Sequence, residues 1–482
     1  MSKKFEVVLI ATPGFGNLVP IVEFAQRLID HDRRFSATIL IITIPGRPLL
    51  DMYIQSRTTS SSNTNNIRSV HLPILDLPSS DHSQVSVALV SSLVEKQKPH
   101  VKQAITNLMA TESNSNSDVP QLAGLFVDMF CTSIIDVANE LDIPCYLYFA
   151  SPATFLSFML HLPVLETQLT TELAELDTEL VIPGFINPVP PSVLPPVALE
   201  RDGFACFLDH ARRYTETKGI VINTLRELES YALDSFSTSQ VSQIPPVYPI
   251  GPALDLAGSA QWHPDRAQHE NIITWLEDQP PSSVVFLCFG SMGSLDGPQV
   301  REIANGLERA RLRFLWSLRE PPKAQIYLPN DYTSLEEVLP NGFLERTAGI
   351  GLVCGWVSQV SILAHKAIGG FVSHCGWNSI LESLWHGVPI ATWPIYAEQQ
   401  MNAFKMVKEL ELAVEIRLDY RRGSAMVLAE EIERGIKCLM DGDGEVRNEV
   451  KEMSKKAKMA VMENGSSYKS LGTLIEELAN KI

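Results

Sequence analysis

Short apolar runs alternate with amphipathic segments along the first half of the chain. The runs that predict buried strands are FEVVLIA (5–11), ATILIITI (37–44), SVHLPIL (69–75), LAGLFVD (122–128) and IPCYLYF (143–149). Helical periodicity predicts helices over 18–30, 84–110, 131–141 and 153–160, and residues 218–229 repeat the strand–helix step. This alternation indicates an α/β fold, in which a parallel sheet is covered by helices on both faces.

Proline and glycine interrupt the pattern in two places. VIPGFINPVPPSVLPP (181–196) cannot continue a helix or a sheet interior, so we expect an ordered surface loop. Residues 249–270 have no period and are typical of a linker between domains. The alternation then restarts, with strands expected over 283–291, 313–318, 351–357, 369–376 and 387–394. The restart predicts two similar domains that face one another, an N-terminal one over 1–248 and a C-terminal one over 271–464.

The net charge of -17 narrows what this fold is expected to bind. Such an acidic chain is unsuited to non-specific binding of nucleic acid or anionic membranes, and any anionic ligand needs a local binding device. No run approaches the roughly 18 apolar residues of a membrane-spanning helix, so we expect no stable membrane insertion. The seven cysteines include no CxxC pair, which favours reduced thiols and a cytoplasmic protein.

The densest chemical signal lies between residues 356 and 399. GGFVSHC predicts a buried strand, and GWNSILESLWHG predicts a helix that begins just after it. Gly376, Asn378 and Ser379 then fall at the turn and the first helical positions, where unpaired N–H groups and the helix dipole favour an anion. His374 can add another donor. Because the segment contains one lysine, Lys366, and no arginine, a phosphate would be held mainly by neutral groups.

Other side chains of this segment suit a nucleotide sugar. Trp356 offers a flat face on which a base can stack, and Gln359 is close enough in sequence to reach the base edge. Glu382, one turn into the helix, is an acceptor suited to ribose hydroxyls. An aromatic wall beside two polar side chains, a combination suited to sugar hydroxyls, is expected from Trp393, Glu398 and Gln399.

With HCGWNS, ESL, GVP and AEQQ in place, residues 356–399 closely resemble the 44-residue signature of plant secondary-product UDP-glycosyltransferases. A weaker resemblance covers nearly the whole chain, including the first glycine-rich turn and VDMF near residue 128. The resemblance implies the GT-B fold, two Rossmann-like domains with the donor mainly on the C-terminal one and the acceptor mainly on the N-terminal one. It also implies a final helix, residues 465–482, that packs back on the N-terminal domain.

The resemblance also assigns roles to the matching positions. By that comparison the donor would be bound by Ser291, Trp356, Val357, Gln359, His374, Gly376, Trp377, Asn378, Ser379, Glu382, Glu398 and Gln399. Of these, Trp356 and Gln359 would meet uracil, Glu382 the ribose, and Trp377 with the last two positions the sugar. A final glutamine in this signature is associated with glucose donors. UDP-glucose is therefore the expected donor substrate, and no further cofactor is expected.

Members of this family invert the anomeric centre, because an acceptor oxygen attacks C1 of the sugar in line as UDP leaves. A histidine in the first glycine-rich turn removes the acceptor proton, and an aspartate orients that histidine. These two catalytic positions match Asn17 and Asp128. The chain departs from the family at Asn17, since an amide cannot act as a general base, and such a base typically contributes about 10²–10⁴-fold in rate.

Three explanations of Asn17 are open at this level. The acceptor needs little deprotonation, as with a carboxylic acid or an acidic phenol, and Asn17 holds it by a hydrogen bond. Alternatively, Asp128 replaces the base, or turnover has been lost, naturally or by deliberate substitution, while binding is kept. A purely structural interpretation stands beside these, because asparagine is a favourable N-cap and Pro20 is expected in the first turn of the helix.

The sequence thus predicts inverting transfer of glucose from UDP-glucose to a hydroxyl or carboxyl of a small aromatic or terpenoid acceptor. The alternative is a UDP-sugar-binding protein with little or no turnover. A dehydrogenase is disfavoured because GFGN lacks the three-glycine dinucleotide fingerprint. The Asp-x-Asp of DGDGE (441–445) is interpreted as a solvated turn, so metal-independent transfer is expected. The candidate acceptor-pocket residues are Phe15, Met129, Phe130, Phe149 and Phe185.

Overall fold

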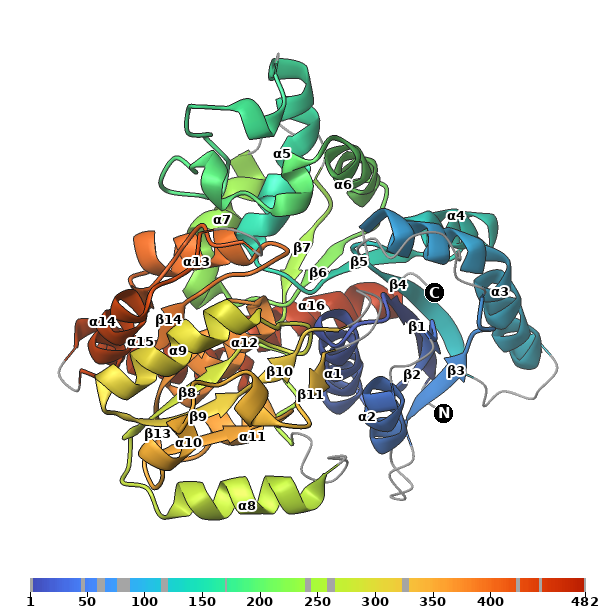
Figure 1. The fold of residues 1–482 in the computed structure, drawn as a ribbon. Helices are drawn as coiled ribbons and strands as arrows, with labels where there is room; N and C mark the ends of the chain where they lie inside the picture. Colours follow the sequence, from blue (N-terminus) through green and yellow to red (C-terminus); the bar gives the residue numbers. More distant parts are fainter. Residues whose placement is uncertain are drawn as a thin grey trace.

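In a computed structural model, the two halves of the chain form two separate parallel sheets (Figure 1). The structure describes residues 3–44, 48–58, 66–75, 87–113, 120–169, 171–238, 244–257, 265–322, 329–421, 425–441 and 444–480. Each sheet carries helices on both faces, so the chain forms two Rossmann-like domains that face one another, as the sequence pattern predicts.

The first sheet has seven strands in the order β3-β2-β1-β4-β5-β6-β7. They are β1 (Phe5–Ala11), β2 (Phe35–Ile41), β3 (Ile67–His71), β4 (Gln121–Asp128), β5 (Cys145–Phe149), β6 (Ile220–Ile222) and β7 (Val247–Pro249). The helices between them are α1 (Phe15–His31), α2 (Pro48–Thr58), α3 (Val87–Ser113), α4 (Ile135–Glu140), α5 (Ala153–Gln168), α6 (Arg201–Tyr214) and α7 (Arg226–Thr238). The strand order reverses between β1 and β4, and doubly wound sheets bind ligands at such a switch point.

The second sheet repeats this order as β12-β9-β8-β13-β14-β15, with its switch point between β8 and β13. Its strands are β8 (Val284–Cys288), β9 (Arg313–Ser317), β12 (Gly351–Cys354), β13 (Ile368–Ser373), β14 (Ile390–Thr392) and β15 (Ala413–Glu415), beside a hairpin of β10 (Arg319–Glu320) and β11 (Asn330–Asp331). Its helices are α8 (Arg266–Glu277), α9 (Gly297–Ala310), α10 (Phe343–Arg346), α11 (Gln359–Leu363), α12 (Trp377–His386), α13 (Gln399–Lys408), α14 (Ala429–Met440), α15 (Glu445–Val461) and α16 (Ser466–Asn480).

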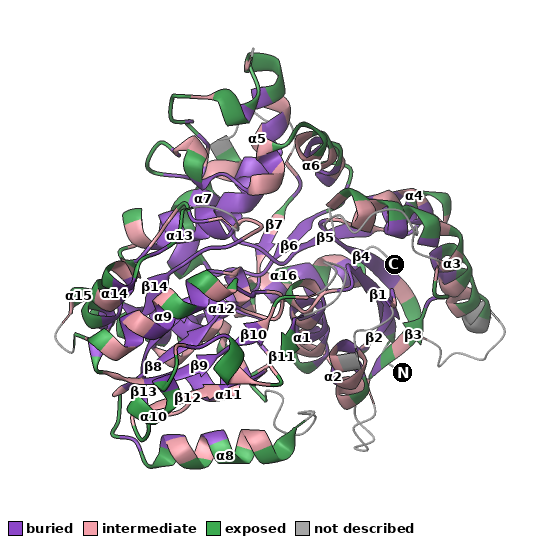
Figure 2. Cartoon of the chain, in the orientation of Figure 1, coloured by how far each residue is buried: buried purple, intermediate pink, exposed green. Residues whose placement is uncertain are grey.

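The central strands are buried throughout, as Figure 2 shows. Successive residues of a strand point to opposite faces, so Val8 and Ile10 of β1 join one apolar cluster while Val7 and Leu9 join another. The second sheet divides its core in the same way. Burial on both faces explains why the strands are nearly continuous apolar runs rather than alternating ones.

The last helix crosses from the second domain to the first (Figure 1). Helix α16 packs on β7 and β4, and its Glu477 accepts a hydrogen bond from the hydroxyl of Tyr146 (3.2 Å). Apolar residues of α16, among them Leu474 and Leu478, are buried in the core beside β1 and α1. The described part of this helix therefore lies where the family resemblance implies.

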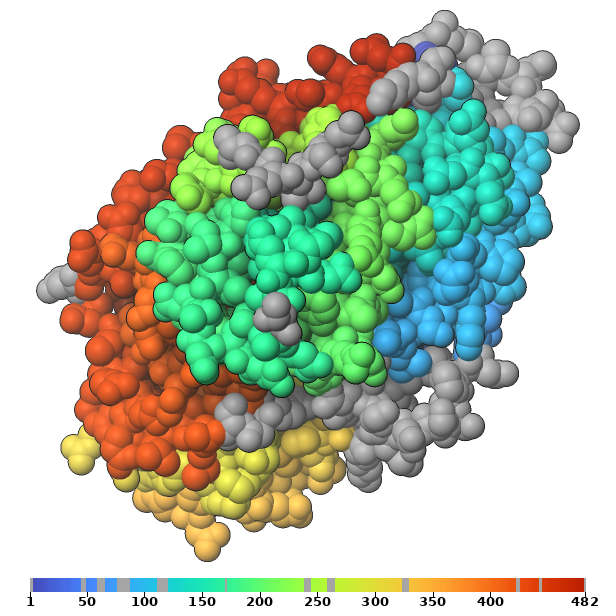
Figure 3. Space-filling model, turned by 90° about the horizontal axis from the view of Figure 1, so that it is seen from above, coloured from blue at the N-terminus to red at the C-terminus, as the bar shows by residue number. Residues whose placement is uncertain are grey.

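A second junction joins the domains on the face seen in Figure 3, where the proline-rich segment (green) adjoins the C-terminal helices (orange). Arg421 donates to carbonyl oxygens of that segment, at 2.6 and 2.9 Å. Beneath it, Lys405 of α13 and Glu229 of α7 form an ion pair of 2.9 Å with both side chains buried. The proline-rich segment is a loop with two short 3₁₀ turns, Pro191–Val193 and Pro196–Leu199.

Some element boundaries differ from the sequence prediction. Helix α1 begins at Phe15, not at residue 18, so Pro20 lies in the second turn of the helix and not in the first. Residues 84–86, 258–264, 442–443 and 481–482 of predicted segments lie outside the described residues, and the domain boundaries near 248 and 270 stay predictions. Among the helices that the structure describes, none is long and apolar enough to cross a bilayer.

Candidate active site

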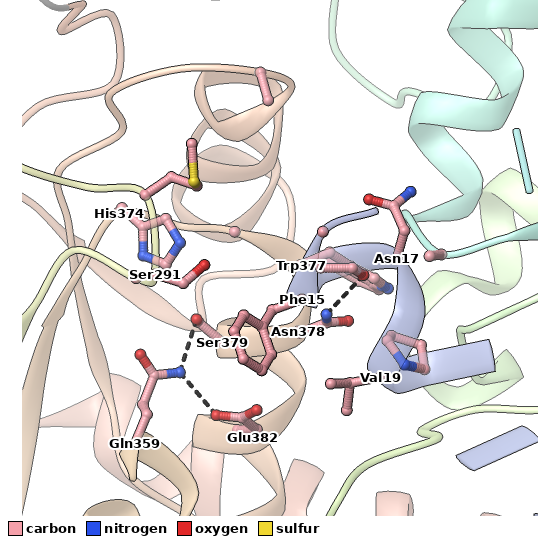
Figure 4. Close-up of a pocket in the computed structure, with 18 of the residues that line it drawn as sticks. Phe15, Asn17, Val19, Ser291, Gln359, His374, Trp377, Asn378, Ser379 and Glu382 are labelled. Atoms are coloured by element: carbon pink, nitrogen blue, oxygen red, sulfur yellow. Dashed lines mark hydrogen bonds between the residues drawn. The ribbon is translucent and has the colours of Figure 1, made fainter. Parts of the chain in front are cut away.

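The two switch points face each other across a cleft of about 470 Å³. The carboxyl ends of β1 and β4 form one side of this cleft, and those of β8 and β13 form the other (Figure 4). The twelve donor-binding residues that the family resemblance assigns all line the cleft, and so does Asn17. Asp128 lies behind Asn17 and is completely buried.

The C-terminal side of the cleft ends at the N-terminus of helix α12. Gly376 is the N-cap and has no side chain with which to cap the helix, so the first backbone N–H groups lack a side-chain partner. Asn378 and Ser379 lie in the first helical turn, and Ser291 follows β8 on the neighbouring strand. Backbone donors, the helix dipole and neutral side chains therefore converge on one point, which is a suitable site for an anion.

His374 contributes to this site as a neutral group. Burial lowers the pKa of its imidazole to about 4, and its Nδ1 has no hydrogen-bond partner within the described part of the chain. Two glycines pack against the ring, since a Cβ at Gly290 or Gly376 would lie 2.5 or 2.6 Å from its Nε2. Gly290 also has a φ of +78°, which side-chain-bearing residues rarely adopt. The imidazole is thus held rigidly at the edge of the cleft.

The C-terminal side of the cleft also contains three hydrogen-bonded side chains from the signature segment. Gln359 Nε2 donates to Ser379 Oγ at 2.8 Å and to Glu382 Oε2 at 2.7 Å (Figure 4). Its carbonyl is therefore the group left to meet a ligand. Burial raises the pKa of Glu382 to about 7, and Asp255 adds to the rise.

The backbone of Trp356 is hydrogen-bonded by Asp331, a residue for which the sequence predicted no function. Asp331 Oδ1 accepts the Trp356 backbone N–H at 2.9 Å and also pairs with Arg319 Nε at 2.9 Å. Gly355 allows this approach, because a Cβ there would collide with the Asp331 carboxylate. Asp331 lies in a two-residue strand without a motif, so no sequence signal identified it.

The far end of the cleft presents side chains whose hydrogen-bonding capacity is already partly used. Gln399 Oε1 accepts two backbone N–H groups, at 2.9 and 3.0 Å, which leaves its NH₂ group for a ligand. Glu398 Oε1 accepts Ser151 Oγ from the other domain at 3.0 Å. Trp377 Nε1 donates to a backbone carbonyl at 2.7 Å, so its indole N–H is not available to a ligand. Trp393 does not line it and is fully buried, so its predicted contact with a sugar is wrong.

On the N-terminal side, Asn17 is the third residue of α1 and not its N-cap, which is Gly14. The capping interpretation is therefore wrong. Asn17 Nδ2 instead donates to Asp128 Oδ2 at 2.7 Å. The other oxygen of Asp128 accepts Thr12 Oγ1 (3.2 Å) and the Phe130 N–H (3.0 Å).

These contacts orient the Asn17 amide. Burial raises the pKa of Asp128 to about 6, so near pH 7 it is mainly a carboxylate that can only accept hydrogen bonds. The NH₂ group of Asn17 must then face Asp128, and its Oδ1 is left for the cleft. Asp128 itself cannot reach a ligand unless Asn17 moves.

The N-terminal side of the cleft, where the resemblance implies the acceptor, is mainly apolar. Phe15, Met129 and Phe130 line it as predicted, whereas Phe149 and Phe185 are buried elsewhere and do not. Further residues that were not predicted from the sequence also line it, and these are Val19, Ile44, Leu50, Tyr53, Val87, Val90 and Ser151. Ser151 had a usable signal, because it follows the carboxyl end of a predicted strand. Among the described residues, no three His, Cys, Asp or Glu side chains are grouped so that they could hold a metal ion.

Comparison with known proteins agrees with this geometry. Residues 236–448 match the family described as UDP-glucoronosyl and UDP-glucosyl transferase. The chain is 57% identical over 478 residues to UDP-glycosyltransferase 43 of Pueraria montana var. lobata, covering 99% of this chain and 100% of that protein. It is 48% identical to UDP-glucose flavonoid 3-O-glucosyltransferase 6 of Fragaria ananassa, with 99% of each covered.

Among solved structures, the chain resembles Medicago truncatula UGT71G1 complexed with UDP-glucose, with a TM-score of 0.88, 42% identity and 99% of each chain covered. The two relatives and the solved structure match both domains, and together with the family match they confirm the resemblance that the signature segment indicates. The chain belongs to the plant family 1 UDP-glycosyltransferases, and its two facing Rossmann-like domains are the GT-B fold of that family.

Proposed function

We propose that this protein transfers glucose from UDP-glucose to an acidic oxygen of a small aromatic or terpenoid acceptor, with inversion at the anomeric carbon. The observation that carries this proposal is the Asn17–Asp128 hydrogen bond of 2.7 Å. It leaves an amide oxygen, and no base, facing the position where an acceptor would lie.

The donor part of the proposal rests on the C-terminal side of the cleft. The N-terminus of α12, with His374, Asn378 and Ser379, offers neutral donors to a departing diphosphate, and such preorganised donors stabilise developing charge without a metal. The ring of Trp356 would stack on uracil, and the NH₂ group of Gln399 would meet the sugar. Glucose is supported by the relative from Medicago truncatula, which was solved with UDP-glucose.

The acceptor part rests on Asn17. A phenolic O–H would donate a hydrogen bond to Asn17 Oδ1, which orients the acceptor oxygen toward C1, whereas a carboxylic acid is already ionised near pH 7 and has no proton to lose. As the new C–O bond forms and the bond from C1 to the UDP oxygen breaks, the acceptor proton passes to water, because Asn17 cannot take it. An acidic O–H lowers the barrier to that loss. The relative from Fragaria ananassa is named as a flavonoid glucosyltransferase, which supports phenolic acceptors.

A graded acceptor series tests this function. We expect UDP release with UDP-glucose to rise steeply from phenol to para-chlorophenol to para-nitrophenol and benzoic acid. Asn17→His should raise turnover on phenol by at least about tenfold, since a general base typically contributes about 10²–10⁴-fold. Asn17→Ala, which supplies no base, is the matched control. Equal wild-type rates across the series, with no gain in Asn17→His, would contradict the missing-base account.

The second candidate is a UDP-sugar-binding protein without turnover, which Asn17 also favours. It predicts tight UDP binding with no UDP release for any acceptor in the series. Asn17→His would then create activity where the wild type has none. The cytoplasmic location stays a prediction, and all seven cysteines are free thiols, as that location would require.

A further inference from the structure

Helix α1 contains a proline, Pro20, that removes one backbone hydrogen bond from the turn before it. Pro20 is the sixth residue of the helix and has no backbone N–H. The carbonyl four residues earlier, that of Gly16, therefore lacks the donor that an α-helix normally supplies. This carbonyl lies beside Asn17, at the edge of the cleft.

The opposite domain supplies a donor for that carbonyl. Asn378 Nδ2 donates to Gly16 O at 2.9 Å, which is the contact drawn across the cleft in Figure 4. Asn378 stands in the first turn of α12, where the donor diphosphate is proposed to bind. Within the described part of the chain its Oδ1 has no hydrogen-bond partner, so the amide acts here through its NH₂ group.

We propose that the Asn378 amide couples the two substrate sites, by bridging the donor diphosphate and the Gly16 carbonyl that Pro20 leaves free. This inference rests on the proposed function, because it requires the diphosphate at α12. One N–H of Asn378 holds Gly16, and its second N–H is available to a phosphate oxygen. Bound UDP then holds the turn that carries Asn17 in place, and the acceptor meets a preorganised site. Pro20 is a positioning residue in this scheme, because it acts through Gly16, whereas Asn378 is a donor-binding residue.

Coupling between two sites appears as a change in the affinity for one ligand when the other is bound. We would measure the Kd of quercetin by calorimetry, with and without saturating UDP. In the wild type, UDP is expected to tighten quercetin binding by about threefold to tenfold, the effect of one neutral hydrogen bond. In Pro20→Ala the restored helical N–H competes for Gly16 O, so this factor should fall toward one while the Kd of UDP alone stays within about twofold.

Matched variants separate this contact from general effects of proline removal. Pro99→Ala removes an exposed proline inside α3, away from the cleft, and should leave the coupling factor unchanged. Asn378→Ala should abolish coupling at saturating UDP, and adding Pro20→Ala to it should have no further effect, because both act through one bond. The melting temperature of each variant checks that it folds.

The outcomes distinguish this inference from the proposed function. Wild-type protein that binds no UDP would overturn the donor site and the coupling together. Protein that binds UDP but shows the same coupling factor in the wild type and in Pro20→Ala would overturn the coupling alone. Coupling lost in both Pro20→Ala and Asn378→Ala, but kept in Pro99→Ala, supports it.

Discussion

The two switch points that face each other across the cleft differ in the charge that they accommodate. At the ends of β8 and β13, neutral donors and a neutral imidazole gather around a place for negative charge. At the ends of β1 and β4, the buried carboxylate of Asp128 needs hydrogen-bond donors. The amide of Asn17, 111 residues away in sequence, supplies one of them. The C-terminal side is therefore suited to bind an anionic ligand, whereas the N-terminal side buries the carboxylate of Asp128.

The glycines on the two sides differ in the same way. Gly290 and Gly376 are packed against His374, so neither can carry a side chain without displacing the ring. A Cβ added at Gly14 or Gly16 would meet no atom within 4 Å, so the first glycine-rich turn borders open space. The two glycine-rich regions therefore differ in packing. We call Gly290 and Gly376, packed against His374, the cradle, and Gly14 and Gly16, which border open space, the rim.

The largest expected effect is on the free energy of unfolding, when the buried ion pair between the two domains is broken. Lys405→Met leaves Glu229 buried without its partner, and breaking a buried ion pair typically costs about 3–5 kcal/mol. We expect a matching fall in the free energy of unfolding, measured with denaturant. Lys408→Met removes an exposed pair on the same helix and should cost about 0–1 kcal/mol. Similar costs for the two variants would show that the buried pair does not hold the domains together.

The glycine comparison is tested by one substitution made on each side. Gly290→Ala forces a Cβ against His374 at a positive φ, and overpacking costs about 1–3 kcal/mol. We expect the Kd for UDP to rise about 10- to 100-fold in calorimetry. Gly14→Ala adds the same methyl group at an extended residue with open space around it, and the Kd should stay within about twofold. A comparable loss in both variants would remove the distinction between cradle and rim.

Each side of the cleft contains a carboxylate whose pKa burial raises toward neutral pH, to about 6 for Asp128 and to about 7 for Glu382. Ribose hydroxyls donate best to an ionised carboxylate, so Glu382 should bind the donor more tightly once it has lost its proton. We expect the affinity for UDP-glucose to increase about threefold to tenfold from pH 6 to pH 8, from one charge-assisted hydrogen bond. UDP-glucose is the suitable probe because its diphosphate has no terminal ionisable oxygen. Glu382→Gln should flatten this dependence, and an unchanged slope would exclude Glu382 as its source.

The smallest effect is expected at the contact between Ser151 and Glu398, where the two sides meet beside the sugar position. Removing one hydrogen bond costs about 0.5–1.5 kcal/mol, so Ser151→Ala should raise the KM for UDP-glucose about threefold with little change in kcat. Ser133→Ala removes a buried hydroxyl without a partner in the described chain and away from the cleft, and should leave KM unchanged. A lower kcat with constant KM would show that this contact does not act through donor binding.

The residues on the donor side of the cleft could be predicted from the sequence more completely than those on the acceptor side. The donor residues come mainly from one 44-residue segment, so the strand, the helix start and the polar positions could be identified together. The predicted donor-binding residues line the cleft, except Trp393. The acceptor residues come from several distant loops and helices, and here the predictions for Phe149 and Phe185 were wrong. The predicted start of α1 at residue 18 was also wrong, because the helix begins at Phe15 and Pro20 lies in its second turn.

The sequence by itself determined the two parallel sheets, their helices and the location of the anion site, because these follow from local apolar periodicity and from donors that are neighbours along the chain. Only the tertiary structure decided which way the Asn17 amide faces, that Asp128 is covered, and that Asn378 reaches Gly16 from the other domain. Those features depend on distances between residues far apart in the chain, and periodicity carries no information about such distances.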